Sequence, residues 1–187
     1  MATFFTIGHS TRSIEEFTEI LKSEKNSLVV DVRTVPRSRT NPQFNSDTLW
    51  SSLAEENIEY VHLAELGGLR GRQRNVQPSP NAFWENQSFR NYADYAMTDA
   101  FRSGFEKLKK LGETKRCVIM CAETLWWRCH RRIITDYLIF TGETVIHILG
   151  LGKTALAKPT PAARPVGTER LIYPDTVVDS KFNMKEA

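Results

Sequence analysis

Apolar and polar positions alternate along the chain with two different periods. Short apolar or β-branched runs predict five strands, at residues 3–7, 28–32, 58–63, 117–121 and 144–149. Apolar side chains at helical spacing predict helices over residues 14–24, from residue 46 to about 53, up to about residue 111, and over 128–141. Strands and helices thus follow one another along most of the chain.

This alternation favours an α/β fold. We expect a single three-layer domain in which a mainly parallel sheet of about five strands is flanked by helices. The continuous apolar run at residues 28–32 is typical of a buried parallel strand. Prolines become frequent after Gly152 and the regular periods end there. The pattern therefore predicts an α/β domain over residues 1–152 and a proline-rich C-terminal arm or tail over 153–187.

Composition agrees with a globular domain, because 41% of the 187 residues are hydrophobic and 25% are charged. No run approaches the roughly 18 apolar residues that a membrane-spanning helix needs, so we expect no membrane partner. The first residues lack the charged and apolar regions of a secretory signal. Three cysteines are an odd number, which argues against a disulfide scaffold and favours the reducing cytoplasm. Nothing in the pattern indicates an oligomeric state.

Unusual polar residues gather where the predicted strands end. In parallel α/β folds, ligands bind beyond the carboxyl ends of the strands, so these residues are expected to share one site. Arginine suits bidentate binding of phosphate or carboxylate, and paired glycines allow close backbone approach. The expected substrate-binding residues are Ser10, Asp31, Arg33, Arg37, Arg39, Gly67, Gly68, Arg70, Arg128 and Arg131.

Cys121 is the predicted nucleophile of this site. It ends an apolar strand and faces a loop that runs into an arginine-rich helix start, where a thiolate is stabilised. The expected acid/base residues are His9, Glu123 and His130. A small buried core residue is the alternative interpretation of Cys121, and it is the interpretation that we adopt for Cys117.

Two further possibilities concern Cys129. It could form a redox pair with Cys121 if the loop between them curls back. Together with Cys121 and His130, and with His9 or His62, it could also offer four soft ligands to zinc. The spacing is not that of a known zinc motif, and the basic residues nearby disfavour a cation. We therefore expect no metal and no cofactor.

The chain resembles the family called domain of unknown function 488. The matching segments are, in order, TIGHSTRSIEEF, VVDVRTVPRSRTNPQFN, YVHLAELGGLR, FRNYADYAMT, CAE, CHR and VIHI, and they cover residues 6–148. The resemblance implies an α/β fold and an enzymatic site without a settled reaction. A weaker, fold-level resemblance is to rhodaneses and cysteine-dependent phosphatases, which also place Asp-x-Arg at an early strand end and a cysteine at a later one. Asp31, Arg33 and Cys121 follow that order, although the span from Cys121 to Arg128 is one residue longer than the phosphatase signature.

Two functions are compatible with these residues. The first is an enzyme, a cysteine-dependent transferase or hydrolase, that acts on a phosphorylated small molecule or nucleotide. The second is a non-catalytic nucleic-acid-binding protein or adaptor, suggested by Arg70, Arg72, Arg74 and the basic tail. The net charge of +3 does not decide between them, because either would rely on local clusters.

Overall fold

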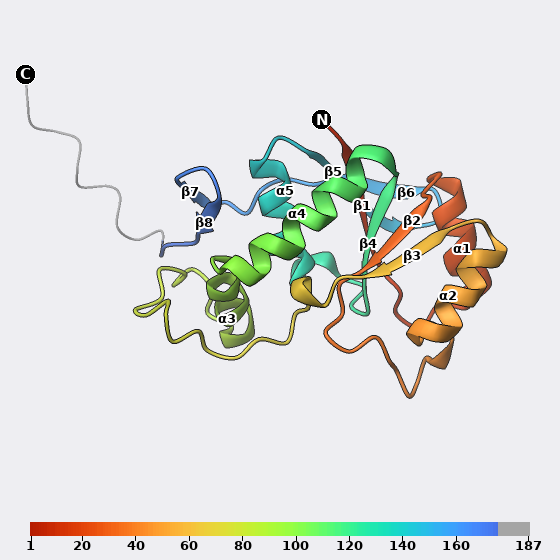
Figure 1. The fold of residues 1–187 in the computed structure, drawn as a ribbon, viewed down its shortest axis with the longest axis horizontal. Helices are drawn as coiled ribbons and strands as arrows, with labels where there is room; N and C mark the ends of the chain where they lie inside the picture. Colours follow the sequence, from red (N-terminus) through yellow and green to blue (C-terminus); the bar gives the residue numbers. More distant parts are fainter. Residues whose placement is uncertain (176–187) are drawn as a thin grey trace, which may run out of the picture.

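A six-stranded sheet forms the centre of the structure (Figure 1). This computed structural model describes residues 1–175. The strand order is β3-β2-β4-β1-β5-β6; the first five strands are parallel, and β6 runs antiparallel to β5. The strands of this sheet are β1 (Thr3–Gly8), β2 (Leu28–Asp31), β3 (Glu59–His62), β4 (Cys117–Cys121), β5 (Thr144–Gly150) and β6 (Lys153–Leu156).

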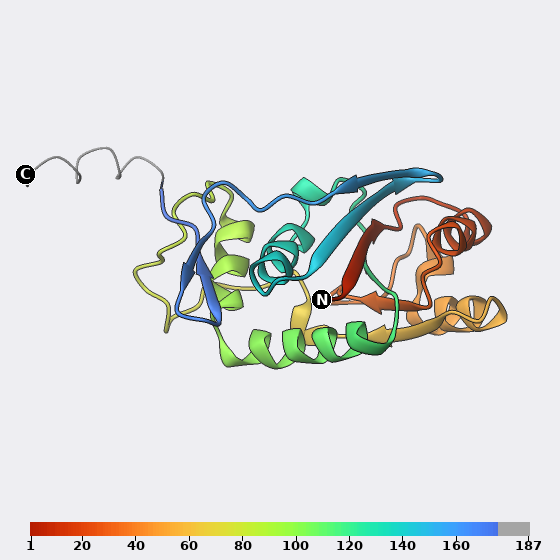
Figure 2. The same ribbon diagram turned by 90° about the horizontal axis from the view of Figure 1, so that it is seen from above.

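Helices cover both faces of this sheet (Figures 1 and 2). One face packs against α1 and α2 and the other against α4 and α5, while α3 lies beyond the sheet, beside α4 and β8 (Arg170–Ile172). The helices are α1 (Ile14–Ser23), α2 (Ser46–Glu55), α3 (Gln87–Ala96), α4 (Asp99–Thr114) and α5 (Arg131–Phe140). Short 3₁₀ helices lie between them: η1 (Pro42–Phe44), η2 (Ala64–Leu66) and η3 (Trp126–Arg128).

Alternate residues of each central strand enter opposite cores. Phe4 and Val30 belong to the cluster beneath α4 and α5, whereas their neighbours Phe5 and Val29 belong to the cluster beneath α1 and α2. A strand buried on both faces needs an unbroken apolar run, which is why the central strands lack an apolar–polar alternation. The predicted three-layer α/β fold is confirmed.

Two local features differ from the sequence expectation. The fifth helix begins at Arg131 and not at residue 128, because residues 126–128 form η3 and Cys129 then adopts extended backbone angles. A sixth strand, β6, follows Gly152, which has a positive φ of 65° in the turn that joins β5 to β6. The first helix starts where expected, after Ser13, whose hydroxyl accepts from the Glu16 N–H.

The segment after β6 returns to the core. It forms a small hairpin of β7 (Arg164–Val166) and β8 (Arg170–Ile172). Tyr173 beyond it is fully buried, and its hydroxyl donates to Asp136 Oδ2 at 3.0 Å. The remainder of the predicted tail, residues 176–187, lies outside the described residues. Within residues 1–175, no helix has the length and apolarity that crossing a bilayer requires.

Candidate functional site

The carboxyl ends of β1, β4 and β2 meet at one edge of the sheet. The register pairs Gly8 with Cys121 and Asp31 with Met120, so the three strands end at the same level. A pocket of about 510 Å³ opens at this edge, which is a typical size for a small-molecule site. Its lining residues are His9, Arg33, Thr34, Val35, Arg37, Ser38, Gly68, Leu69, Ser88, Phe89, Tyr92, Cys121, Ala122, Glu123, Arg128, Cys129 and His130.

A cysteine–histidine pair lies in this pocket. Cys129 Sγ is 3.6 Å from Nδ1 of His130, the next residue along the chain. The other ring nitrogen, Nε2, lies 2.9 Å from the Val32 carbonyl oxygen. Because a carbonyl only accepts, Nε2 carries the proton in neutral His130 and leaves the Nδ1 lone pair facing the thiol. His130 can therefore take up the Cys129 proton.

Arg131 completes this arrangement from behind the pocket. Its side chain is only 1% exposed, and it donates through Nε to Cys129 Sγ at 3.3 Å and through Nη2 to the Glu123 carbonyl oxygen. No carboxylate within residues 1–175 forms an ion pair with this guanidinium. A buried cation needs a counter-charge, and the Cys129 sulfur is the bonded group that can become an anion.

The two pocket thiols differ in acidity. The pKa of Cys129 lies well below its usual value because Cys121, His130 and Arg131 stabilise the thiolate against the penalty of burial. The pKa of Cys121 lies well above its usual value, because its thiol proton is held towards the Cys129 thiolate and because it is buried. Cys129 is thus the more acidic thiol of the pair. For the nucleophile, this geometry favours Cys129 over the predicted Cys121.

Cys121, Cys129 and His130 also meet the distance requirement for a metal site. One ligating atom from each lies within 4.8 Å of the other two, as three ligands of one soft divalent cation would. The Nε2 bond to Val32 would orient His130 as metal-bound histidines are oriented. The surrounding charge opposes a cation, however, because Arg131 lies against the sulfur and three more arginines line the pocket.

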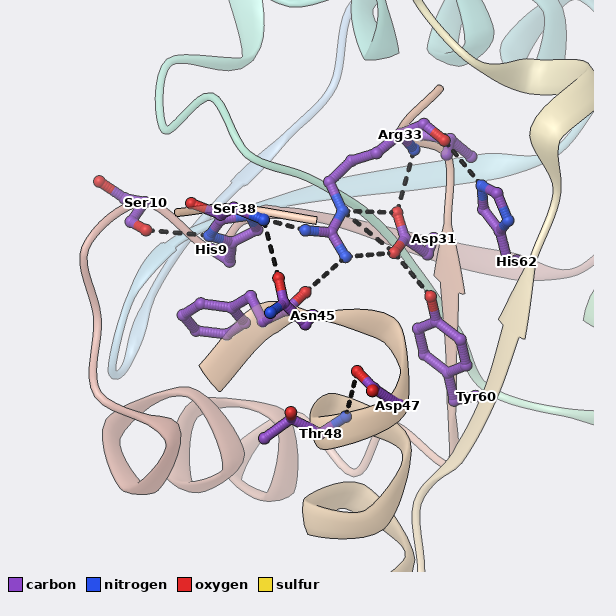
Figure 3. Close-up of polar contacts among 12 residues, drawn as sticks. His9, Ser10, Asp31, Arg33, Ser38, Asn45, Asp47, Thr48, Tyr60 and His62 are labelled. Carbon is purple, nitrogen blue, oxygen red and sulfur yellow. Dashed lines mark hydrogen bonds and ion pairs between the residues drawn. The ribbon is translucent and has the colours of Figure 1, made fainter. Parts of the chain in front are cut away.

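A second polar network lies beside the pocket, centred on Asp31 and Arg33 (Figure 3). The fully buried Asp31 carboxylate accepts from Arg33 Nη2 at 2.6 Å and from the Tyr60 hydroxyl at 2.8 Å. Arg33 also donates through Nη2 to the Phe44 carbonyl oxygen at 2.8 Å. Every other nitrogen of Arg33 donates to Asp31, whereas Nη1 faces His9. Asp31 thus fixes Arg33 at the pocket wall.

His9 is held in this network as a neutral ring. Its Nδ1–H donates to the Ser10 carbonyl oxygen at 2.9 Å, and Nε2 lies 3.3 Å from Arg33 Nη1, from which it can accept. The ring also stacks on Phe44 at 4.2 Å. Burial is the main cause that lowers the pKa of His9 to about 4, and the charge of Arg33 adds to it. With both nitrogens engaged, His9 is suited to positioning Arg33.

The remaining predicted residues divide into two groups. Arg37, Arg128 and Glu123 line the pocket with exposed side chains. Arg70 does not line it, because its guanidinium bonds to the carbonyl oxygens of Gly67 and Ala64 and lies over the Tyr95 ring. Ser10, Asp31, Arg39, Gly67 and Arg131 also lie outside the lining set, although Ser10, Asp31 and Arg131 contact residues within it.

Sequence reasoning missed the wall that α3 contributes. Phe89 and Tyr92 line the pocket, and the Tyr92 ring packs edge-on against His130 with centroids 5.0 Å apart. Their helical spacing indicated only core packing. The cap residue Asn86 accepts from the Ser88 and Phe89 N–H groups and so fixes this end of the helix beside the pocket. The sequence signal that could have indicated this part of the pocket was the start of α3 directly after a long loop.

Gly68 lets the chain pass directly over His130. A Cβ at this position would lie 2.4 Å from His130 Nδ1, so Gly68→Ala must displace the imidazole or the loop. We expect the variant to raise the pH midpoint of Cys129 ionisation, measured from thiolate ultraviolet absorbance, and to lose about 1–3 kcal/mol of stability through overpacking. Gly71→Ala is the matched control, because a Cβ there has no atom within 4 Å. Equal midpoints in the two variants would contradict the His130 contact.

Fold and site together define an α/β protein with a cysteine–histidine pocket at the carboxyl edge of a parallel sheet. A family model described as "Domain of unknown function DUF488" matches residues 13–138, more than half of the chain. The chain belongs to this family, as the sequence motifs predicted. Comparisons with curated proteins and with solved structures gave no match.

Proposed function

We propose that the pocket is the active site of a cysteine-dependent transferase or hydrolase acting on a phosphorylated, nucleotide-like substrate. The observation that carries the proposal is the buried Arg131 guanidinium on Cys129, with His130 Nδ1 on the other side of the same sulfur. An arrangement that keeps one sulfur anionic inside a pocket serves a nucleophile better than it serves packing.

The pocket charge supports a phosphorylated substrate. Arg33, Arg37 and Arg128 line it, whereas Glu123 is the one acidic residue among the lining side chains. Arg37 and Arg128 are exposed and free to turn towards a ligand, while Arg33 is fixed by Asp31. Charge-assisted hydrogen bonds from guanidinium groups are well suited to phosphate oxygens.

The apolar part of the lining supports a flat organic group on that phosphate. Leu69 and Phe89 offer apolar and aromatic surface with the buried Tyr92 ring, and Ser38 and Ser88 add hydroxyl groups to the lining. Aromatic side chains bind the faces of nucleobases by stacking. A nucleotide-like molecule has both parts, an anion for the arginines and a ring for this part of the lining.

In this reaction Cys129 is the nucleophile and Glu123 the acid/base residue. Cys129 Sγ attacks the electrophilic centre of the bound substrate and the bond to the leaving group breaks. Glu123, whose carboxylate Oε1 accepts from the Leu125 N–H at 3.0 Å, is placed to give or take the proton of the leaving group or of the second nucleophile. The second nucleophile, water in a hydrolase or an acceptor in a transferase, displaces sulfur and regenerates the thiolate.

Binding of adenosine monophosphate, inorganic phosphate and uncharged adenosine to the reduced protein, measured by calorimetry, tests the substrate class. We expect adenosine monophosphate to bind most tightly, and Arg37→Gln and Arg128→Gln each to weaken it about 10- to 100-fold, the equivalent of one charge-assisted hydrogen bond. Arg74→Gln is the matched control, because Arg74 is exposed and outside the pocket lining. Equal affinities for adenosine and its monophosphate would contradict the proposal.

The nucleic-acid alternative depends on Arg70, Arg72 and Arg74 and on the basic residues of the tail. Arg70 is bonded within the fold, so the alternative relies on Arg72, Arg74 and the tail. It remains a prediction, and the same calorimetry with a short oligonucleotide tests it. Binding that falls steeply with salt and is lost in Arg74→Gln would favour it.

A further inference from the structure

We propose that Cys121 and Cys129 are a reversible redox pair, in which a hydroperoxide oxidises Cys129 and Cys121 resolves the product as a disulfide. The inference rests on the Cys129 thiolate of the proposed function. It adds a modification site with its own chemistry, for which no phosphorylated substrate is required.

The geometry brings two sulfurs from different elements together. Cys121 ends β4, and Cys129 follows η3 in an extended conformation that turns its side chain back towards the strand. Both thiols are free, and their sulfur atoms lie within 4.8 Å of each other. A disulfide needs a separation of about 2 Å, so the sulfurs must approach further. Residues 122–124 of the connecting loop are exposed, and the bonds that this approach has to shift are those of the Ala122 and Glu123 carbonyl oxygens with the Ser10 N–H and Arg131.

The two thiols have the complementary properties that the reaction needs. The Cys129 thiolate attacks the distal oxygen of the hydroperoxide, the O–O bond breaks, and Cys129 becomes a sulfenic acid while an alkoxide or hydroxide leaves. The Cys121 thiol then attacks that sulfenic sulfur, the S–O bond breaks, and one water molecule leaves with the thiol proton. The two sulfurs together lose two electrons, which the peroxide gains. An added dithiol reduces the disulfide and returns both thiols.

The buried charge makes this disulfide easy to reduce. Oxidation removes the negative charge from Cys129, and Arg131 then remains buried beside a neutral sulfur. The reduced form keeps the ion pair, so the equilibrium is displaced towards the dithiol relative to an ordinary disulfide. A cysteine pair of this kind is suited to a reversible switch and not to a structural disulfide. While the disulfide is present, the pocket has no nucleophile. Formation of the disulfide also protects Cys129 from irreversible oxidation until a dithiol reduces it.

Cys117 gives an internal control in the same chain. It lies on β4 only four residues before Cys121, but it is fully buried beneath the helical layer formed by α4 and α5. Burial raises the pKa of Cys117 to about 12, so it stays a protonated and unreactive thiol. Oxidation of Cys117 would therefore indicate unfolding of the protein and not a reaction in the pocket.

The test treats the reduced full-length protein at neutral pH with one equivalent of hydrogen peroxide, blocks free thiols with a maleimide, and maps the peptides by mass spectrometry. We expect one Cys121–Cys129 disulfide per chain, an unmodified Cys117, and full reversal by dithiothreitol. In Cys121→Ser, one equivalent is expected to leave Cys129 as sulfenic acid, and a further equivalent, given to the wild type alike, is expected to convert it to sulfinic acid. Cys117→Ser is the matched variant and should behave as the wild type.

Several results would overturn the redox pair. Accumulation of Cys129 sulfinic acid in the wild type at the rate seen in Cys121→Ser would show that Cys121 does not resolve. A bound zinc ion whose removal by chelator is needed for any reaction would assign the two sulfurs to a metal instead. Calorimetry with adenosine monophosphate on the reduced protein separates the two proposals, because failure of the disulfide leaves the Arg37 and Arg128 effects unchanged.

Discussion

Asp31→Ala is expected to lower the free energy of unfolding by about 3–5 kcal/mol, which is the usual effect of removing one partner from a buried ion pair. The carboxylate is fully buried and accepts from the Arg33 backbone N–H at 3.0 Å, from the Arg33 side chain and from Tyr60. Without it, the Arg33 guanidinium stays buried and charged with only the Phe44 carbonyl and His9 as partners. Chemical denaturation measures the loss.

Three further variants show whether the charge or the packing is responsible. Glu56→Gln breaks the exposed Lys22–Glu56 pair, whose atoms are 2.7 Å apart, and should change stability by no more than about 1 kcal/mol. Combining Asp31→Leu with Arg33→Met removes both buried charges and should be less destabilising than Asp31→Leu alone. If Asp31→Ala were no worse than Glu56→Gln, the network would not be holding the pocket wall together.

The fold was accessible from sequence because burial on both faces leaves a strong pattern. The run Leu28–Asp31 has no polar interruption before its last residue, and Asp31 then marks the strand end where the network forms. The rule that ligands bind at carboxyl ends of parallel strands placed His9, Arg33, Cys121 and the pocket on one edge. The strand β6 was missed, because its four residues follow a turn and pair only at the sheet edge.

The roles inside the site were less accessible, because side-chain direction depends on backbone geometry that spacing does not encode. Cys121 was favoured over Cys129 because it ends a strand, whereas Cys129 was assigned to the predicted helix. The 3₁₀ turn of residues 126–128 delays the helix and turns Cys129 into the pocket. Arg131 was expected to bind substrate, and the structure instead buries it behind the sulfur.

The same reasoning applies to the two histidines. His9 follows a strand end and His130 lies near the start of the predicted helix 128–141, and the sequence treats both alike as acid/base residues. The structure gives His9 two hydrogen-bond partners and a pKa of about 4, whereas it leaves His130 Nδ1 facing a thiol. The position of a neighbouring carbonyl oxygen, Val32 for His130 and Ser10 for His9, decides which nitrogen of each neutral ring carries the proton.

The Arg131→Met variant is expected to raise the pH at which Cys129 ionises towards the usual thiol value. Burial favours the neutral thiol, and the variant opposes it only with Cys121 and His130, because the guanidinium on Sγ is gone. Thiolate ultraviolet absorbance gives the midpoint when Cys117 is replaced by serine, since Cys121 ionises only at higher pH and stays in place as the hydrogen-bond donor to Cys129. Arg128→Gln is the matched control, because this exposed arginine belongs to the same loop and has no bond to the sulfur.

The same substitution changes how folding stability depends on pH. In the wild type, the folded state binds fewer protons than the unfolded state between the lowered Cys129 pKa and the unfolded value of about 8.5. The free energy of unfolding therefore rises with pH across that window, and this contribution is lost as pH falls through the lowered pKa. In Arg131→Met, the folded-state pKa of Cys129 moves towards the unfolded value, so the pH window narrows and the contribution to stability across it should be smaller. An unchanged slope, together with an unchanged absorbance midpoint, would remove Arg131 as the counter-ion and with it the argument for a preformed thiolate.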